Sequence, residues 1–305
     1  MPRLNCSRIP RSSMHTVLLL PFIALVSLAQ PDSVQPRIER YLATKRATVG
    51  VGVKLLEGGP SFVLGDAHRY PMQSTYKFPL AVAMLQRVDS GAFALAQPIH
   101  IAARDLRKQT WSPIREKYPK GEVTLTLAEL LGFTVSQSDN NGCDILFRMM
   151  KGTKETERRL IRMGYSDIRM RATEAEMARA WPVQYTNWTR PSAMLRLLEG
   201  VYKGSSLSAS SNAFLLKLLT ETSTGPKRIK GLLPAGTVVA HKTGSSGTNA
   251  KGITAATNDV GIITLPDGRP VALVVFVSDS LETPDDNERI IAEIARMVYD
   301  GLTAK

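Results

Sequence analysis

The stretch Pro71-Met-Gln-Ser-Thr-Tyr-Lys-Phe-Pro79 places a serine and a lysine three residues apart, at Ser74 and Lys77. On a helix, positions i and i+3 share a face, and their side chains can touch. A serine hydroxyl becomes an effective nucleophile when a base takes its proton, and a lysine with a lowered pKa can be that base. A helix start followed by a solvated lysine explains the same pair. The choice between these readings depends on the rest of the chain.

Two further tripeptides follow in the sequence, Ser138-Asp139-Asn140 and Lys242-Thr243-Gly244. Taken alone, the first is typical of a turn or a helix cap, and the second of a strand end with a solvated lysine. The combination with Ser74-x-x-Lys77, in this order, is improbable by chance. It is the motif set of class A β-lactamases and penicillin-binding proteins. The three motifs together therefore favour an acyl-serine enzyme.

Strand-like segments lie near both ends of the chain, and helical spacing fills the middle. Two hairpins are expected, because β-rich runs flank a Gly-Gly-Pro turn and a Pro-Asp-Gly turn. Thr283-Pro284 has the form of an N-cap followed by proline at the first helical position. We predict an antiparallel sheet covered by the terminal helices, with a second lobe of helices. The predicted strands are 47–56, 61–64, 237–240, 260–264 and 271–277; the sheet lobe comprises about 30–70 and 220–305, and the helical lobe about 71–219.

The N-terminus has the order of features found in a secretory signal peptide. Three arginines precede the apolar run 17–26, and Ser27-Leu28-Ala29 follows as a small-x-small cleavage site. Cleavage after Ala29 lowers the formal net charge from +12 to +9, because the leader contains three arginines and no acids. It also removes Cys6 and leaves Cys143 as the one cysteine, so no internal disulfide is expected. We expect residues 1–29 to direct a soluble protein to the periplasm.

With these motifs the sequence resembles a class A serine β-lactamase of the PER/VEB-type branch. The branch is indicated by Thr173-Glu-Ala-Glu-Met177, Gln184-Tyr-Thr-Asn-Trp188 and the stretch 231–243. The resemblance covers nearly all of the chain after the leader. It implies a β-lactamase/transpeptidase-like α/β fold, with a five-stranded antiparallel sheet flanked by terminal helices, an all-helical lobe, and the active site between them.

The resemblance also implies roles for individual residues. Ser74 is the expected nucleophile, Lys77 its base or proton relay, and Ser138 the group that passes a proton to the lactam nitrogen. Glu174 is expected to activate the deacylating water, because Thr-Glu-Ala-x-Met is how this branch writes that position; Glu176 is the competing acid. The implied substrate-binding residues are Trp111, Asn140, Arg228, Lys242, Thr243, Gly244 and Ser245. Surface pairing for Arg228 and packing for Trp111 are equally good explanations.

The sequence departs from the common class A pattern in the loop that carries Glu174. Ala178 stands where that pattern has an asparagine that helps to hold the water, and Ala172 stands in place of a loop arginine. The connection 245–255 after Lys-Thr-Gly is also long. By resemblance, a longer loop widens the site for bulky oximino-cephalosporins. Pro79, five residues after the serine, removes a backbone donor that a helix interior needs.

The sequence leaves two other functions open beside a β-lactamase that hydrolyses penicillins and cephalosporins. One is a small penicillin-binding DD-peptidase, and the other is a β-lactam sensor domain that stays acylated. Zinc hydrolysis is disfavoured, because the three histidines after the leader do not form a ligand motif. Scattered basic residues also disfavour nucleic acid as a partner. We expect a monomer with small-molecule β-lactam substrates, no cofactor and no membrane association after processing.

Overall fold

The computed structural model describes residues 1–2 and 34–304. The predicted leader, residues 1–29, therefore falls outside the described residues except for its first two. The α-helices are α1 Val34–Leu42, α2 Lys77–Asp89, α3 Pro113–Lys117, α4 Leu127–Ser136, α5 Asn140–Met149, α6 Thr153–Arg162, α7 Glu174–Met177, α8 Pro191–Tyr202, α9 Ala209–Thr220 and α10 Pro284–Thr303. Short 3-10 helices are η1 Gln73–Tyr76, η2 Ala103–Asp105 and η3 Trp181–Thr186.

The strands form three sheets, of which one has five strands in the order β2-β1-β10-β9-β8. Every pairing in it is antiparallel, so the predicted five-stranded antiparallel sheet is confirmed. Strand β1, near the start of the described chain, pairs with β10 near its end. The large-sheet strands are β1 Thr48–Leu55, β2 Ser61–Leu64, β8 Val239–Ser245, β9 Thr254–Thr264 and β10 Pro270–Ser280; the others are β3 Tyr70–Pro71, β4 Pro98–Ile101, β5 Val123–Thr126, β6 Ile168–Arg169 and β7 Trp188–Thr189.

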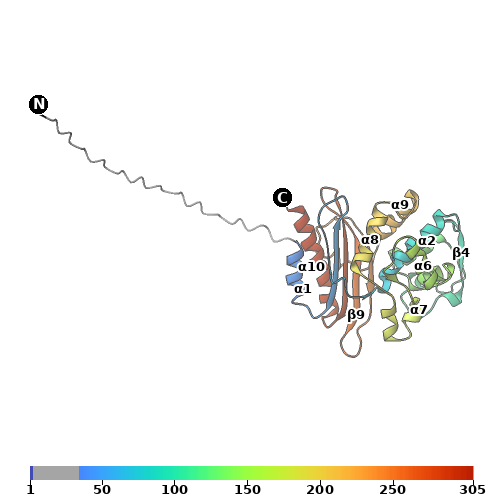
Figure 1. Ribbon diagram of the computed structural model, residues 1–305. Coiled ribbons are helices and arrows are strands. Elements are labelled where there is room, and N and C mark those ends of the chain that lie inside the picture. The colour runs from blue at the N-terminus through green and yellow to red at the C-terminus, as the bar shows by residue number, and fades with distance from the viewer. Residues whose placement is uncertain (3–33, 305) are drawn as a thin grey trace. The chain divides into compact units, whose positions relative to one another are not determined.

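Helices cover both faces of the large sheet, which lies between α1 and α10 on one side and α8 on the other (Figure 1). Strand β10 shows the consequence, because nearly all of its residues are buried. Val271, Leu273 and Val275 pack with the terminal helices, whereas Val274 and Phe276 pack with the helical side. A strand buried on both faces reads as a continuous apolar run, which is why this segment shows no alternation in the sequence.

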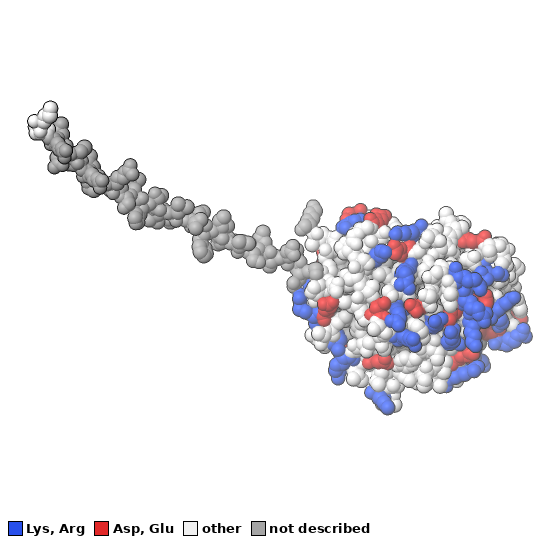
Figure 2. Space-filling model, in the orientation of Figure 1, with Lys and Arg blue, Asp and Glu red and all other residues white. Residues whose placement is uncertain are grey.

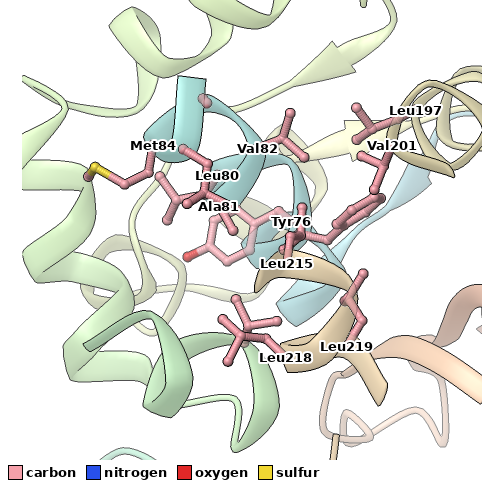
Figure 3. Close-up of a cluster of buried hydrophobic side chains, with 14 of the residues drawn as sticks. Tyr76, Leu80, Ala81, Val82, Met84, Leu197, Val201, Leu215, Leu218 and Leu219 are labelled. Atoms are coloured by element: carbon pink, nitrogen blue, oxygen red, sulfur yellow. The ribbon is translucent and has the colours of Figure 1, made fainter. Parts of the chain in front are cut away.

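The second core lies among the helices beyond α8. Helix α2 is its centre, and its residues from Lys77 to Leu85 are all buried. Leu80, Ala81 and Val82 lie in one apolar cluster with Leu197 and Leu215 from α8 and α9 (Figure 3). This core fixes α2, and with it the serine turn that precedes α2.

The structure corrects several predicted bounds. The predicted strand 237–240 begins two residues early and ends five early, because β8 runs from Val239 to Ser245. Its later residues are polar but buried, and an apolar pattern cannot reveal such positions. Strands β9 and β10 are also longer than predicted. The middle of the chain contains the short pairs β4–β5 and β6–β7, which were not predicted because four or fewer residues carry little periodicity.

None of the helices in the described part of the chain combines the length and the apolarity that a membrane span requires.

Candidate active site

Ser74 lies in the 3-10 turn η1, directly before α2, rather than in the first turn of the α-helix itself. The Lys77 side chain nevertheless returns to it, with Nζ 3.0 Å from Ser74 Oγ. The change from 3-10 helix to α-helix at Lys77 also explains why Pro79 is tolerated. It is the third residue of α2, where the backbone N–H has no intrahelical acceptor, so its missing donor costs the helix nothing.

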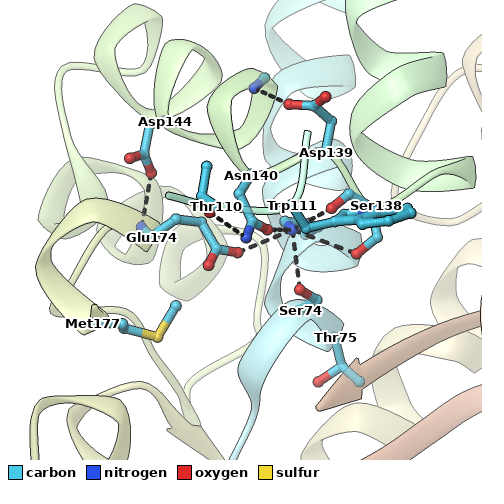
Figure 4. Close-up of polar contacts among 12 residues, drawn as sticks. Ser74, Thr75, Thr110, Trp111, Ser138, Asp139, Asn140, Asp144, Glu174 and Met177 are labelled. Carbon is cyan, nitrogen blue, oxygen red and sulfur yellow. Dashed lines mark hydrogen bonds and ion pairs between the residues drawn. The ribbon is translucent and has the colours of Figure 1, made fainter. Parts of the chain in front are cut away.

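Lys77 is fully buried. The polar atoms of Ser74, Ser138, Asn140 and Glu174 point toward one another in Figure 4. The Lys77 ammonium lies 2.9 Å from Glu174 Oε1. It donates to Ser138 O at 2.9 Å and to Asn140 Oδ1 at 2.5 Å, and it lies 3.4 Å from Ser138 Oγ. The structure therefore brings the other three predicted catalytic residues, Ser74, Ser138 and Glu174, around Lys77 Nζ.

Lys242 approaches Ser138 from the large sheet. Its Nζ donates to Ser138 Oγ at 2.9 Å, and the side chain is completely buried in β8. Burial, followed by the nearby charge of Lys77, lowers the pKa of Lys242 well below its usual value. Because two lysine nitrogens flank Ser138 Oγ, this hydroxyl is surrounded by proton donors on its inner side and can direct its own proton outward.

Asp139 holds the Ser138–Asn140 segment in place. It caps α5 by accepting from Gly142 N at 2.7 Å, and it also accepts from Ile114 N and Ser112 Oγ. Ser138 itself has the left-handed φ of 61°. Burial raises the pKa of Asp139, although the three hydrogen bonds oppose that rise. Asp139 is thus a structural residue that projects its two neighbours toward Lys77.

Gly244 lets strand β8 pass against the nucleophile turn. A Cβ at this position would lie 2.6 Å from Met72 O and 3.0 Å from Ser74 N. Those distances are too short for any side chain, so only glycine permits the contact. Asn258 on the neighbouring strand reinforces it, because its Nδ2 donates to Pro71 O and Met72 O. The backbone of Ser74 and that of the Lys-Thr-Gly strand are thereby held side by side.

Glu174 is the first residue of the short helix α7 and is 9% exposed. Thr173 and Glu176 form a capping box at the start of this helix. Asp144 on α5 accepts from Glu174 N at 2.7 Å and from Ala175 N at 3.0 Å. Burial raises the pKa of Asp144 to about 6. The two backbone hydrogen bonds oppose this rise, and the charge of Glu174 adds to it. The carboxylate of Asp144 therefore anchors the backbone that presents Glu174.

Two cavities open onto the cluster. The first, of about 260 Å³, is lined by Ser74, Trp111, Ser138, Asn140, Thr224, Gly225, Arg228, Thr243, Gly244 and Ser245. The second, of about 510 Å³, is lined by Gln73, Thr110, Asn140, Glu174, Met177, Ala178, Arg179, Ala180, Trp181, Gln184, Ser245, Ser246 and Gly247. Asn140 and Ser245 line both. A ligand on Ser74 can therefore extend from one cavity into the other.

Comparison with known proteins identifies the family. A sequence model described as the β-lactamase enzyme family matches residues 33–302. The chain is 42% identical to β-lactamase VEB-1 of Pseudomonas aeruginosa, over 96% of this chain and 98% of the relative. It is 41% identical to the extended-spectrum β-lactamase PER-1 of the same species, over 93% and 92%. The chain belongs to the β-lactamase enzyme family.

Solved structures agree with this assignment. The TLA-1 extended-spectrum β-lactamase is 53% identical, with a TM-score of 0.86 over 88% of this chain and 98% of that one. A β-lactamase from Chitinophaga pinensis is 51% identical, with a TM-score of 0.87 over 88% and 99%. The predicted fold, the class A assignment and the β-lactam hydrolase activity are therefore confirmed, and the protein is a serine β-lactamase.

Arg228 is a buried residue of this β-lactamase rather than a surface one. Its guanidinium donates to Gly244 O, Asn258 O and Ser245 Oγ, and its Nε lies 3.1 Å from Glu288. It therefore holds β8 and lines the first cavity at the same time. Trp111 is 54% exposed at the edge of that cavity, with Nε1 donating to Gln137 O.

Several residues of the β-lactamase site were not predicted from the sequence. Thr110 accepts from Asn140 Nδ2 at 2.8 Å, and Thr224 Oγ1 lies 2.5 Å from Thr243 Oγ1. Asn187 accepts from Arg171 N and Ala172 N and donates to Ala172 O. Thr110 and Thr224 carry no motif; Asp144 had a signal, because it lies four residues after Asn140 and so shares a helix face with it.

The remaining polar groups near the site do not form a metal centre. No cluster of three or more His, Cys, Asp or Glu side chains suited to a metal ion occurs within residues 1–2 and 34–304. His241 points away from the Lys242 side of β8, and its Nδ1 lies 2.9 Å from Asp259 Oδ1. Cys143 is fully buried, and burial raises the pKa of its thiol well above the usual value.

Proposed function

We propose that this β-lactamase works through an acyl-enzyme on Ser74, which Lys77 and Ser138 help to form and Glu174 helps to hydrolyse. The observation that carries the proposal is the single position of Lys77 Nζ, 3.0 Å from Ser74 Oγ and 2.9 Å from Glu174 Oε1. A nucleophile, a basic amine and a carboxylate in contact can exchange protons without moving.

The acceptors around Lys77 explain how Ser74 is activated. Ser138 O and Asn140 Oδ1 accept hydrogen bonds from the Lys77 ammonium, and the Glu174 carboxylate is its ion-pair partner. Transfer of one proton to Glu174 leaves a lone pair on Lys77 Nζ, which then accepts the Ser74 proton as Oγ attacks the lactam carbonyl. The C–N bond breaks as Ser138 Oγ passes its proton to the lactam nitrogen and is reprotonated from Lys77 Nζ, which received the Ser74 proton.

Negative charge on the attacked carbonyl oxygen needs preorganised donors. The backbone N–H groups of Ser74 and Ser245 are the proposed pair, because the Gly244 contact holds their strand and turn together. Arg228, Thr243 and Ser245 line the first cavity and present positive charge and hydroxyls to the substrate carboxylate, while Lys242 lies buried behind Ser138. Asn140 is placed to bind the side-chain amide, since it lines both cavities.

Deacylation requires water in the second cavity beside Glu174. Glu174 first returns the proton it received to Lys77 Nζ. Its carboxylate then takes a proton from this water, hydroxide attacks the acyl carbon, and the Ser74–acyl bond breaks as Oγ recovers a proton from Lys77 Nζ, which regains one from Glu174. Ala178 lines the same cavity and offers no side-chain hydrogen bond. Asn140 Oδ1 is already bound by Lys77, and Gln73 and Gln184 bind each other, so we propose that Glu174 and backbone groups hold the water.

We propose that the substrates are penicillins and cephalosporins, including those with bulky oximino side chains. Support comes from the volume of the second cavity, about 510 Å³, which lies beside the Ser246–Gly247 loop and η3. Two relatives, PER-1 and TLA-1, carry "extended-spectrum" in their names. Such an enzyme confers β-lactam resistance on the cell that makes it.

The test is the lifetime of the acyl-enzyme in Glu174→Gln, with Glu176→Gln as the matched control. Both changes remove one acid from α7, but only Glu174 contacts Lys77. We expect the unmodified protein to turn over a chromogenic cephalosporin many times. Glu174→Gln should give one burst and a Ser74 adduct that persists in intact-mass spectra, whereas Glu176→Gln should turn over. A persistent adduct in the unmodified protein would instead indicate a β-lactam sensor or a penicillin-binding peptidase.

We propose further that the protein is exported to the periplasm, is cleaved after Ala29 and acts there as a monomer without membrane association. The order of arginines, apolar run and small residues supports export. Intact mass of the periplasmic product tests the cleavage site, and a mass beginning at Met1 would contradict it. Sedimentation of that product tests the monomer, and a concentration-dependent dimer would contradict it.

A further inference from the structure

A separate cavity, which shares no residue with the two cavities of the active site, lies between the ends of α2, α5 and α6. Its volume is about 350 Å³, and it is lined by Arg87, Met149, Met150, Lys151, Glu155, Arg158 and Arg159. Arg87 comes from the last turn of α2, and Lys151 follows the end of α5. The three residues 155, 158 and 159 lie on α6.

The lining carries four cationic side chains and one carboxylate. Glu155 is already occupied, because Arg158 binds it at 2.6 Å and Arg162 at 2.9 Å. No carboxylate in the described ranges pairs with Arg87, Lys151 or Arg159; Arg87 lies over the ring of Phe93 instead. Three cations without counter-charge therefore face one hollow. Figure 2 shows lysines and arginines gathered on the part of the surface where Figure 1 places α2 and α6.

Arg159 is the least satisfied of these groups. Its Nη1 donates to Gln86 Oε1 at 2.8 Å, but its Nε is buried and has no acceptor. Burial, together with the charges of Arg87 and Arg162, lowers the pKa of Arg159. A group of like charges without counter-charge costs free energy, and one bound oxyanion would lower that cost.

We propose that this cavity binds a phosphate group, with the guanidinium groups of Arg87 and Arg159 as its principal donors. Planar guanidinium forks match tetrahedral oxyanions with paired hydrogen bonds, and Lys151 adds a point charge at the rim. Met149 and Met150 supply an apolar wall, which suits a phosphate ester better than bare phosphate. The phosphate can belong to a soluble phosphate ester or to a lipid headgroup.

Binding of inorganic pyrophosphate, measured by calorimetry at physiological ionic strength, tests the site. The test variant is Arg87→Gln/Arg159→Gln, and the control is Arg37→Gln/Arg289→Gln, which removes the same charge from α1 and α10. We expect the unmodified protein and the control to bind alike, and the test variant to bind at least about tenfold more weakly. Cephalosporin hydrolysis should be equal in all three proteins, which shows that the test variant is folded.

Equal pyrophosphate binding by the test variant and the control, or no binding by the unmodified protein, would overturn the proposal. The single variant Arg87→Gln serves if the double variant does not fold, because Arg87 is only half-buried at the end of its helix. Pyrophosphate should raise the Tm of the unmodified protein but not that of the variant.

Vesicle sedimentation separates the two sources of the phosphate. Phosphatidylcholine vesicles are compared with vesicles that also contain phosphatidic acid, which exposes a phosphate monoester. Sedimentation with phosphatidic acid that the test variant loses and the control keeps assigns the site to a lipid phosphate. Pyrophosphate binding without sedimentation assigns it to a soluble phosphate. Sedimentation that both variants lose equally reflects net charge alone and, together with equal pyrophosphate binding, contradicts the site.

Discussion

Asp144 is a side chain outside the predicted catalytic groups that holds the backbone of one of them, Glu174. Its carboxylate accepts two backbone N–H groups at the start of α7, while burial raises its pKa from 3.8 to about 6. The folded protein therefore binds this proton more tightly than the unfolded chain does. The free energy of unfolding that Asp144 contributes must then fall as the pH rises from about 4 to about 6, and must be constant below and above that window.

We predict that Asp144→Asn removes this pH dependence and slows deacylation. The asparagine amide keeps one acceptor oxygen but turns its NH₂ toward a backbone N–H donor. The lost hydrogen bond lowers the free energy of unfolding by about 1.5–3 kcal/mol. The difference in free energy of unfolding between the two proteins, measured against pH, gives the first effect. The rate of loss of the acyl-enzyme gives the second. A pH-independent difference would show that Asp144 does not titrate in this range.

Arg179 is an exposed residue on the wall of the larger cavity and has no carboxylate partner among the described side chains. A substrate whose oxime carries a carboxylate would place that charge toward it. We predict that Arg179→Gln lowers kcat/KM for such a cephalosporin by about two- to fivefold, and leaves a methyl-oxime cephalosporin unchanged. The ratio of the two kcat/KM values at low and high salt is the measurement. Equal losses for both substrates would mean that Arg179 acts on the loop and not on the substrate.

The contact between η1 and β8 brings together the two backbone N–H groups proposed as oxyanion donors, those of Ser74 and Ser245. We predict that Gly244→Ala lowers kcat/KM by at least about a hundredfold, because a methyl group would push the strand away from Ser74 N. The single-turnover acylation rate should carry the loss. Gly247→Ala is the control, since a Cβ there meets no atom within 4 Å. Comparable losses in both variants would contradict the argument.

The 3-10 helix η3 is tied to two residues of unusual backbone conformation. Gln73 (φ 48°), just before the nucleophile, donates to Gln184 Oε1, and Tyr185 donates to Asp279 (φ 49°) at the end of β10. Left-handed φ values in residues other than glycine persist only where surrounding contacts hold them. Gln184 and Tyr185 therefore anchor the Glu174 loop to the nucleophile turn and to the sheet.

We predict that Gln184→Ala slows both acylation and deacylation, whereas Tyr185→Phe lowers stability by about 1 kcal/mol with acylation unchanged. The difference arises because only Gln184 reaches the residue that precedes Ser74. Pre-steady-state kinetics and urea unfolding separate the two effects. Normal acylation in Gln184→Ala would show that Gln73 keeps its conformation without this bond.

The motifs predicted the elements of the site better than their bounds. Ser74-x-x-Lys77 indicated a shared face, and that pairing is present even though the serine lies in a 3-10 turn. The end of β8 was missed, because His241, Lys242 and Thr243 are buried polar residues in a strand. Burial of polar groups depends on partners from distant segments, here Asp259, Ser138 and Thr224, which no local pattern contains.

The two ends of the range 34–304 lie close together. Strand β1 pairs with β10, and α1 packs on α10, with Gly301 directly against Val34. We predict that a permutant joining residue 304 to residue 34 by a short Gly/Ser linker, with new ends at the exposed turn Gly204–Ser205, keeps cephalosporin hydrolysis within about tenfold. Activity and thermal unfolding are the measurements. An insoluble or inactive product would show that β1 must be made first.

Three spaced motifs, a glutamate in the expected loop and strands at both ends of the chain could be identified from the sequence alone, and they indicated acyl-serine chemistry. Those features are local, so propensity and spacing can reveal them. Three features required the folded structure: the burial of Arg228, the contacts of Asp144 and Gln184 with the Glu174 loop, and the meeting of four cations between α2, α5 and α6. Each of these depends on residues far apart in the chain, whose contacts arise from the packing of helices and strands against one another.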